Sequence, residues 1–475
     1  MTKNKELVKN TIIILAGKVC TQFISFLLLP LYTAVLATQE YGTVDLVTTY
    51  VGLLAPLITL QLENSVFRYL VDTRNNEKNK TKIITNAYFI TILLALLIFI
   101  IFIVAANFIE ISYKYYICGM IFSVICSNML LQTARGNGNN KDYSIGSVIS
   151  GGITIILNVL FLVVLKLGIT GMFLATIIAN LLCAVYIFIR EKIYRNIDIQ
   201  YINKKEIYIL LKYSLPLVPN GIIWWIINVS DRTIISIVLG SAANGIYSVS
   251  NKFSNVFIQI YNIFNLSWTE TASLHINDED RDEFFSNTIQ KMFVLFSSIC
   301  IGIIAIMPFI FNILINNQYE EAYRYIPLLM IASLFNVIVG LISVIYVAKK
   351  LTKEIAKTSF FSGVINLLVN IILIKYIGIY AAVVSTIISF ATMAIYRFID
   401  IQKYVKIKID FKIIVNTSLI LCSSIILYYI NNTILNILNI AIAIIYTVIN
   451  NNIYIKYIIK YTKEIKEKYF NKNNI

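Results

Sequence analysis

The sequence is short of charge. Only 14% of its 475 residues are Asp, Glu, Lys or Arg, against about 25% in a typical soluble domain. A soluble globule of this size would need a polar surface that the chain cannot supply. Apolar residues reach 58% and mean hydropathy is +0.76. These values also exclude a disordered chain, because so apolar a chain cannot stay solvated and unpacked. The composition is that of a polytopic membrane protein.

Metal ligands and catalytic motifs are scarce as well. The chain has one histidine, His275, and six cysteines that form no CxxC pair and lie inside apolar stretches. A Cys/His metal site and structural disulfides are therefore not expected. No P-loop, HExxH, GxSxG or paired-carboxylate pattern is present, so the sequence predicts neither an ATPase motor nor an enzyme, and no cofactor.

Long apolar runs occupy most of the chain. A bilayer core about 30 Å thick needs about 20 helical residues per span. The polar start, 1–10, leads into an apolar run too long for a signal peptide and without a small-residue cleavage site, so we expect the first span to be retained. About 14 spans are predicted in all. By residue number they are 11–36, 43–67, 83–106, 112–133, 143–165, 171–189, 213–239, 243–268, 291–315, 325–348, 356–375, 379–399, 413–430 and 433–455.

The net charge of +15 is distributed unevenly along the chain. With the N-terminus inside, 33 of the 40 Lys and Arg fall in inner segments, 4 in outer segments and 3 within spans. The positive-inside rule therefore predicts that both termini are cytoplasmic. No basic cluster is interleaved with aromatic residues on a polar face, so nucleic-acid binding is not expected. The longest inner connection, 269–290, carries an acidic run and is expected to be a solvated loop.

The chain repeats itself after about 200 residues. Val35–Val47 matches Val238–Ser250 at an offset of 203, and two further matches follow in spans 5/11 and 6/12 at offsets of 212 and 210. A repeat of six spans preserves orientation, so it predicts two six-helix bundles related by a pseudo-twofold axis along the membrane normal, an arrangement found in transporters. The expected organisation is an N-terminal lobe at 1–195, a C-terminal lobe at 196–410, and two more helices with a basic tail at 411–475.

Three cations lie within predicted spans. Each ionisable group there costs about 2.5–3.5 kcal/mol on insertion scales and needs a partner or a polar cavity. With one deep acid, Asp231, the net charge of these groups is positive, which suits an anionic head group such as phosphate or pyrophosphate. The predicted substrate-binding residues are the three cations and two polar neighbours: Lys18, Gln22, Arg232, Asn251 and Lys252.

Two other features of spans 7 and 8 allow more than one interpretation. Asp231 is either a Na⁺ or proton coupling site or the counter-ion of a salt bridge, for instance to Lys252, that only pins two helices. Pro216 and Pro219 at the start of span 7 favour equally a gating element or a packing kink, because unpaired backbone carbonyls are tolerated only against protein or a water-filled cavity.

The stretches Tyr213–Gly221 (YSLPLVPNG), Ser230–Val249 (SDRTIISIVLGSAANGIYSV) and Tyr32–Leu46 carry a family resemblance. They resemble the polysaccharide flippase family of the multidrug/oligosaccharidyl-lipid/polysaccharide exporter superfamily, over roughly residues 5–410. The resemblance implies two six-helix bundles forming a V around a cationic cavity, with two extra C-terminal helices. It also implies translocation of undecaprenyl-pyrophosphate-linked oligosaccharide across the bacterial cytoplasmic membrane by alternating access, with membrane lipids and a polysaccharide polymerase as partners.

Two alternatives remain. One is a cation-coupled multidrug or small-molecule exporter of the same superfamily. The other is a membrane-embedded glycosyltransferase or ligase, which would need a catalytic acid beside a sizeable outer loop, whereas every predicted outer loop is short. Without a nucleotide-binding motif, transport is expected to be passive or driven by an ion gradient or the membrane potential, which is worth about 2.3 kcal/mol per charge per 100 mV.

Overall fold

The computed structural model describes residues 26–74, 76–108, 112–349 and 351–452. Within these ranges the chain forms 16 α-helices and no strands, which confirms the all-α fold. Eleven segments are long and apolar enough to cross a membrane. Two more of the predicted spans are the helices α10 (Leu217–Val238) and α11 (Ser241–His275). The first predicted span, 11–36, lies largely outside the described residues.

Packing divides the chain into two compact units. Unit 1 comprises 1–249 and 370–379, and unit 2 comprises 250–369 and 380–475. Helices α11 and α14 (Thr352–Ile377) contribute residues to both units. The lobe boundary expected near residue 195 stays a prediction, because these units follow packing density and not the sequence repeat.

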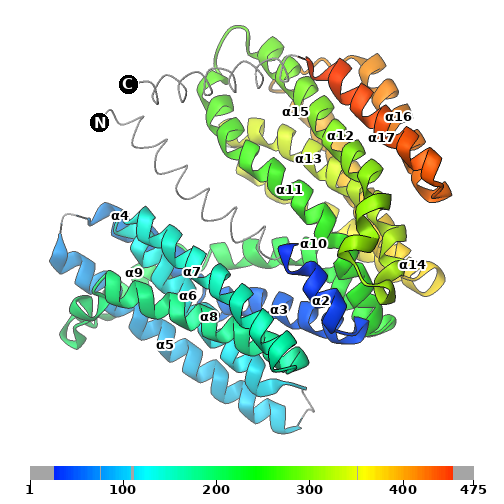
Figure 1. The fold of residues 1–475 in the computed structure, drawn as a ribbon. Coiled ribbons are helices and arrows are strands. Elements are labelled where there is room, and N and C mark those ends of the chain that lie inside the picture. Colours follow the sequence, from blue (N-terminus) through cyan, green and yellow to red (C-terminus); the bar gives the residue numbers. More distant parts are fainter. Residues whose placement is uncertain (1–25, 75, 109–111, 350, 453–475) are drawn as a thin grey trace, which may run out of the picture. The chain divides into compact units, whose positions relative to one another are not determined.

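The remaining helices of unit 1 precede α10. Helix α8 packs against both α6 and α7, and α4 packs against α6 (Figure 1). Helix α8 buries Gly171, Ala175 and Ala179, which are four residues apart and allow neighbouring backbones to approach closely. The bounds are α2 Leu29–Val35, α3 Thr38–Ile58, α4 Leu62–Asp72, α5 Glu77–Phe108, α6 Lys114–Gly136, α7 Asn140–Val159, α8 Gly168–Arg190 and α9 Lys204–Ser214.

The span predicted at 43–67 is not one helix. Helix α3 ends at Ile58, and Leu60 and Gln61 both adopt left-handed backbone angles before α4 begins. The backbone N–H of Gln61 donates to Pro56 O at 2.8 Å, so the break keeps its hydrogen bonds. The Gln61 side-chain amide donates to Leu217 O at 3.1 Å. This contact ties the break to the first residue of α10.

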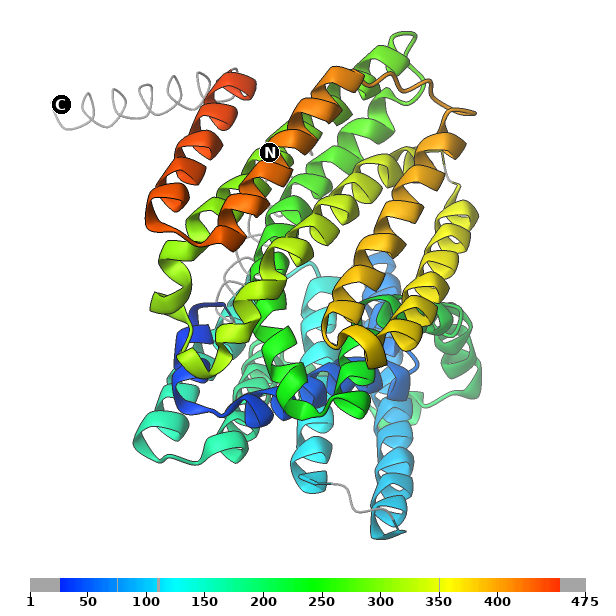
Figure 2. The ribbon, with the colours of Figure 1, turned by 90° about the vertical axis from the view of Figure 1, so that its right-hand side faces the viewer.

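Unit 2 contains the last two helices as predicted. Helices α16 and α17 pack against each other and against α12 (Figure 2). Ala443 and Tyr446 of α17 meet Ile301 and Ala305 of α12 in a buried apolar cluster. The bounds are α12 Arg281–Leu314, the 3₁₀ segment η4 Asn317–Tyr325, α13 Ile326–Ala348, α15 Tyr380–Ile401, α16 Phe411–Ile430 and α17 Thr433–Asn450.

The connection predicted as a solvated loop at 269–290 is mostly helical. Helix α11 continues to His275 and α12 begins at Arg281, so only five residues join them. The acidic run instead leads into α12, where Asp282 and Glu283 occupy the first turn and interact favourably with the positive end of the helix dipole.

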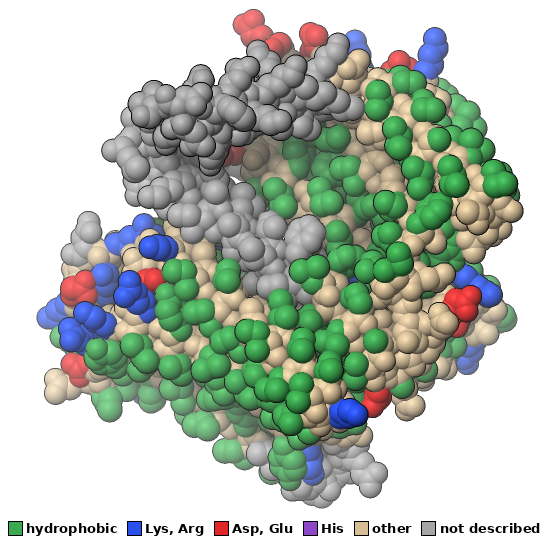
Figure 3. All heavy atoms as spheres, viewed as in Figure 1, with side chains coloured by type: hydrophobic (Ala, Val, Ile, Leu, Met, Phe, Trp, Pro, Cys, Tyr) green, Lys and Arg blue, Asp and Glu red, His purple; other side chains and the backbone are tan. Residues whose placement is uncertain are grey.

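Apolar side chains dominate the molecular surface that faces the viewer in Figure 3, and charged side chains gather toward the helix ends. The large exposed hydrophobics lie on the long helices, for example Ile100 on α5 and Ile372 on α14. An apolar exterior of this kind suits lipid contact. The chain is a multi-pass membrane protein.

A buried guanidinium in unit 2 escaped the sequence analysis. Arg397 of α15 is 2% exposed. It donates to Thr358 Oγ1 at 2.9 Å, to Ser359 Oγ at 3.0 Å, to Ile355 O at 3.2 Å, and also to Ser343 Oγ. These partners are hydroxyls and a carbonyl, so hydrogen bonds hold α13, α14 and α15 together around one cation.

Replacing Arg397 by Met is expected to leave the unfolding temperature in detergent unchanged or higher. The hydroxyls of Thr358 and Ser343 also donate to carbonyls of their own helices and keep those partners, and apolar groups of similar volume often replace buried charges without loss. Arg397→Ala should instead cost about 2–5 kcal/mol through the cavity it leaves. Equal destabilisation by Met and Ala would show that the charge itself is required.

Candidate functional site

The first turns of α3 and α11 cross at two glycines of unit 1. A Cβ on Gly42 would lie 1.8 Å from Ser241 O, and a Cβ on Gly245 would lie 2.0 Å from Thr38 O. Both positions therefore require glycine. The Asn244 side-chain amide donates to Gly42 O at 2.8 Å.

This crossing has the symmetry of the sequence repeat. The offset of 203 relates Thr38 to Ser241 and Gly42 to Gly245. The contact of Gly42 with Ser241 and the contact of Gly245 with Thr38 are therefore exchanged by the repeat. The match between Val35–Val47 and Val238–Ser250 thus corresponds to a local pseudo-twofold contact between two helix ends.

An ion pair lies one turn further along the same two helices. Asp45 of α3 and Ser248 of α11 are also related by the repeat, and Ser248 Oγ donates to Asp45 Oδ2 at 2.6 Å. Arg232 Nε of α10 lies 3.2 Å from the same oxygen. That contact is an ion pair without hydrogen-bond alignment, because Arg232 Nε has no hydrogen-bond partner in the described structure. Arg232 Nη1 donates to Thr49 Oγ1 at 3.0 Å.

The neighbouring carboxylate, Asp231, is 4% exposed. Its two oxygens accept hydrogen bonds from Asn370 Nδ2 at 2.7 Å and from the Tyr247 hydroxyl at 3.3 Å. Asn370 brings α14 into the group. We call Asp45, Asp231 and Arg232, with Ser248, Tyr247 and Asn370, the polar cluster of unit 1.

The polar cluster joins four helices through buried charge. It holds two carboxylates and one guanidinium, so its own formal charge is negative and Arg232 is compensated by Asp45. Buried charges of this kind persist only when paired and hydrogen-bonded, as they are here. Sequence reasoning found Asp231 and Arg232 because charges are rare in spans. It did not pair Arg232 with Asp45, because the repeat relates Asp45 to Ser248 and does not include Arg232.

The other predicted site residues are placed as follows. Asn251 and Lys252 lie on α11 in unit 2, and both are partly exposed. Pro216 is the residue before α10, and Pro219 lies in its first turn, where a missing N–H breaks no helical hydrogen bond. Lys18 and Gln22 lie outside the described residues. Within the described ranges no three His, Cys, Asp or Glu side chains are arranged to hold a metal ion.

Comparison with known families decides the classification. A family model described as "Polysaccharide biosynthesis protein" matches residues 7–269, more than half of the chain. The chain belongs to the polysaccharide biosynthesis protein family. The matched range of this family member contains the glycine crossing and, apart from Asn370, the whole polar cluster. A search of curated protein sequences finds no match.

Solved structures similar to this family member share its fold. The lipid II flippase MurJ in an inward closed conformation aligns with a TM-score of 0.70 at 15% identity, covering 95% of this chain and 100% of the other. An outward-facing multidrug resistance MATE family transporter of the MOP superfamily aligns at 0.59 and 13% identity, covering 83% and 94%. A MOP superfamily transporter from Pyrococcus furiosus aligns at 0.58 and 13% identity, covering 84% and 96%. These likenesses show that the chain has the same fold as these proteins.

Proposed function

We propose that the protein translocates undecaprenyl-pyrophosphate-linked oligosaccharide across the bacterial cytoplasmic membrane for surface polysaccharide synthesis. The observation that carries the proposal is the match to a family whose members are described as polysaccharide biosynthesis proteins. The fold supports it. The lipid II flippase covers 95% of the chain, whereas the MATE transporter covers 83%. Both termini are proposed to be cytoplasmic, on the charge asymmetry, and a polysaccharide polymerase is proposed as a partner.

The pyrophosphate is proposed to bind the cations of the predicted spans. Lys18, Arg232 and Lys252 supply the positive charge, and Gln22 and Asn251 supply hydrogen bonds. Arg232 is paired with Asp45 in this structure, so an anionic ligand must compete with that carboxylate. Exchange of one anionic partner for another keeps the guanidinium compensated throughout, which avoids the cost of an unpaired buried charge.

Three other predicted site residues suggest how transport is driven and gated. Asp231 is the proposed coupling site, since its carboxylate is buried and accepts an amide hydrogen bond at Oδ1 and a hydroxyl hydrogen bond at Oδ2. The Tyr247 hydroxyl can turn to accept a hydrogen bond when Oδ2 is protonated. Pro216 and Pro219 are the proposed gating positions at the start of α10. An inside-negative potential would favour export of the anionic substrate.

A second candidate function is cation-coupled export of a multidrug type. The observation that favours it is the fold, which the chain shares with a multidrug resistance MATE family transporter.

Deletion of the gene distinguishes the two functions. We expect loss of surface polysaccharide and accumulation of lipid-linked oligosaccharide on the cytoplasmic side, with unchanged sensitivity to cationic drugs. Complementation with Lys252→Ala should restore little polysaccharide, whereas Lys375→Ala, which removes an exposed cation at the end of α14, should restore it fully. Raised drug sensitivity with normal surface glycan would instead support the exporter.

A further inference from the structure

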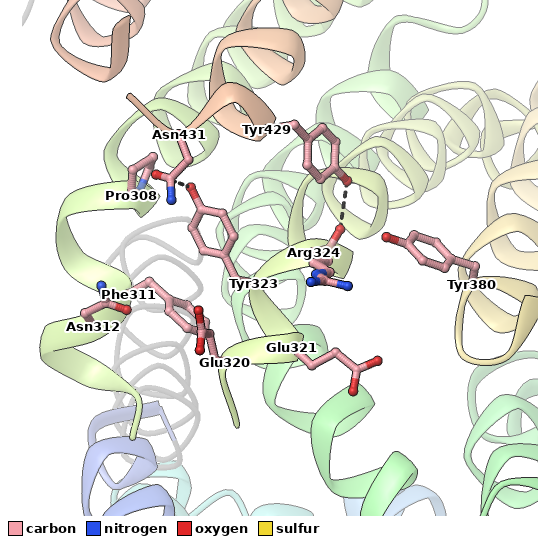
Figure 4. Close-up of a pocket in the computed structure, with 10 residues that line it drawn as sticks. All are labelled: Pro308, Phe311, Asn312, Glu320, Glu321, Tyr323, Arg324, Tyr380, Tyr429 and Asn431. Carbon is pink, nitrogen blue, oxygen red and sulfur yellow. Dashed lines mark hydrogen bonds between the residues drawn. The ribbon is translucent and has the colours of Figure 1, made fainter. Parts of the chain in front are cut away.

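Unit 2 contains a cavity of roughly 760 Å³ where η4 meets the ends of α12, α15 and α16 (Figure 4). This volume lies within the usual range for ligand sites. The charge asymmetry places the connections α12–α13 and α16–α17 and the start of α15 on the outer side of the membrane. The cavity is thus at the predicted outer end of unit 2 and is separate from the polar cluster of unit 1.

Tyrosine rings line one side of the cavity. Tyr323 stacks on Tyr428 with ring centroids 4.1 Å apart, and Phe311 packs edge-on against Tyr323 at 5.3 Å. The Tyr428 hydroxyl donates to Tyr323 O and the Tyr429 hydroxyl donates to Arg324 O, each at 2.7 Å. These bonds anchor η4 on α16. The rings are therefore fixed in place before any ligand arrives.

A further ring stands on the other side. Tyr380, the first residue of α15, packs edge-on against Tyr325 at 4.8 Å and is partly exposed in the cavity lining. Figure 4 shows Arg324 between the rings of Tyr323 and Tyr380, with Tyr429 above it and Glu320 and Glu321 below. Aromatic rings and charged groups thus line the same cavity.

The polar groups exclude a phosphate ligand. Glu320, Glu321 and Arg324 are all exposed, so the lining holds two carboxylates and one guanidinium. No ion pair within 4.0 Å joins Arg324 to either carboxylate in the described part of the chain. One oxygen of Glu321 accepts a hydrogen bond from the Tyr325 hydroxyl at 2.5 Å, which leaves the Glu320 carboxylate and the second Glu321 oxygen as acceptors for a ligand. An acidic lining repels pyrophosphate. Carboxylates, amides and a guanidinium bind hydroxyls and amines, and tyrosine faces pack against the C–H faces of sugar rings.

We propose that this cavity binds a neutral or amine-bearing sugar ring of the exported glycan on the outer side of the membrane. The proposal rests on the proposed function and adds a second, sugar-specific site to the cationic one. Tyr323 and Tyr380 supply stacking faces, Glu320 and Glu321 accept hydrogen bonds from hydroxyls or an amine, and Arg324 donates. The sugar belongs either to the lipid-linked unit or to free glycan released after polymerisation.

Saturation-transfer NMR on the purified full-length protein tests the site directly. The protein is held in a zwitterionic detergent, because sugar-based detergents would compete, and is titrated with methyl glucoside and with glucosamine. We expect saturation transfer to both, stronger for glucosamine, and no displacement by inorganic pyrophosphate. Tyr380→Leu should weaken binding about three- to tenfold, the size of a lost stacking contact. Transfer to ethanolamine phosphate in place of the sugars would overturn the proposal.

Matched variants separate ligand contacts from folding. Tyr376→Leu removes a tyrosine of α14 that is 82% exposed and outside the cavity, and it should bind both sugars normally. The double variant Glu320→Gln/Glu321→Gln keeps the shape and should lose the preference for glucosamine. If Tyr380→Leu and the double variant both bind like the unchanged protein, the cavity is not a sugar site.

Two competition arms identify the source of the sugar. Displacement of methyl glucoside by lipid-linked oligosaccharide assigns the site to the arriving substrate, and displacement by free polysaccharide alone assigns it to released product. Failure of the proposed function is a separate result. Sugar binding with no flipping of lipid-linked oligosaccharide would refute the function and keep the site, whereas flipping by a protein that binds no sugar would refute the site alone.

Discussion

Gly245→Ala and Gly42→Ala are each expected to abolish transport and to lower the unfolding temperature sharply. The added methyl carbon would lie about 2 Å from a backbone carbonyl oxygen of the opposing helix, and backbone cannot move aside as a side chain can. The two helix ends must separate, which breaks the Asn244–Gly42 and Ser248–Asp45 hydrogen bonds. Overpacking a side chain costs about 1–3 kcal/mol, and we expect this backbone clash to reach or exceed the upper figure.

Gly52→Ala is the matched control for these two variants. Gly52 lies on the same helix, α3, and its Cβ would have no neighbour within 4 Å. Alanine is favoured over glycine within a helix by about 1 kcal/mol, so this variant should be as stable as the unchanged protein or more so. Thermal unfolding of the purified proteins in detergent makes the comparison. Three indistinguishable unfolding temperatures would mean that the crossing is not formed as described.

The Asp45–Arg232 ion pair is expected to show a strongly non-additive double-mutant cycle. Asp45→Ala removes the carboxylate that is ion-paired with the buried Arg232 guanidinium, and it removes the acceptor of Ser248. Removing one partner of a buried pair typically costs about 3–5 kcal/mol. Arg232→Ala leaves the Asp45 carboxylate without its cation. The double variant Asp45→Ala/Arg232→Ala should therefore be more stable than the sum of the two single losses predicts.

An exposed pair in the same unit provides the reference. Arg68 and Asp72 form an i,i+4 ion pair on α4 at 2.5 Å, with side chains 48% and 54% exposed. Such pairs contribute about 0.3–0.5 kcal/mol. Unfolding temperatures of both sets of variants, measured in the same detergent, give the two coupling energies. A coupling at Asp45–Arg232 no larger than that at Arg68–Asp72 would contradict a buried, structurally required pair.

Hydropathy was sufficient to predict the helical class and the ends of most spans. The C-terminal pair predicted at 413–430 and 433–455 is observed at Phe411–Ile430 and Thr433–Asn450. The break between α3 and α4 could not be predicted, because Leu60 and Gln61 carry no glycine-like preference for left-handed angles. Tertiary contact with α10 holds them there.

Side-chain partners were harder to predict than helices. Arg397 was assigned to an inner connection by its charge, yet it is buried because hydroxyls on two other helices converge on it. Contacts between side chains that are far apart in the chain leave no pattern in the sequence around either residue. The Asp45–Arg232 pair could not be read from the repeat either, because the repeat relates Asp45 to Ser248 and does not include Arg232. The cavity of unit 2 is lined by residues more than 100 positions apart, so no short stretch of the sequence contains it.

Flipping by the purified protein in proteoliposomes tests the central claim most directly. Vesicles carry undecaprenyl-pyrophosphate-linked oligosaccharide in both leaflets, and a glycan-degrading enzyme added outside consumes only the outer pool. The account predicts that the protein makes the inner pool accessible, that Lys252→Ala slows this strongly, and that Lys375→Ala does not. An inner pool that stays as protected as in protein-free vesicles, while the same vesicles move a cationic dye along an ion gradient, would contradict it.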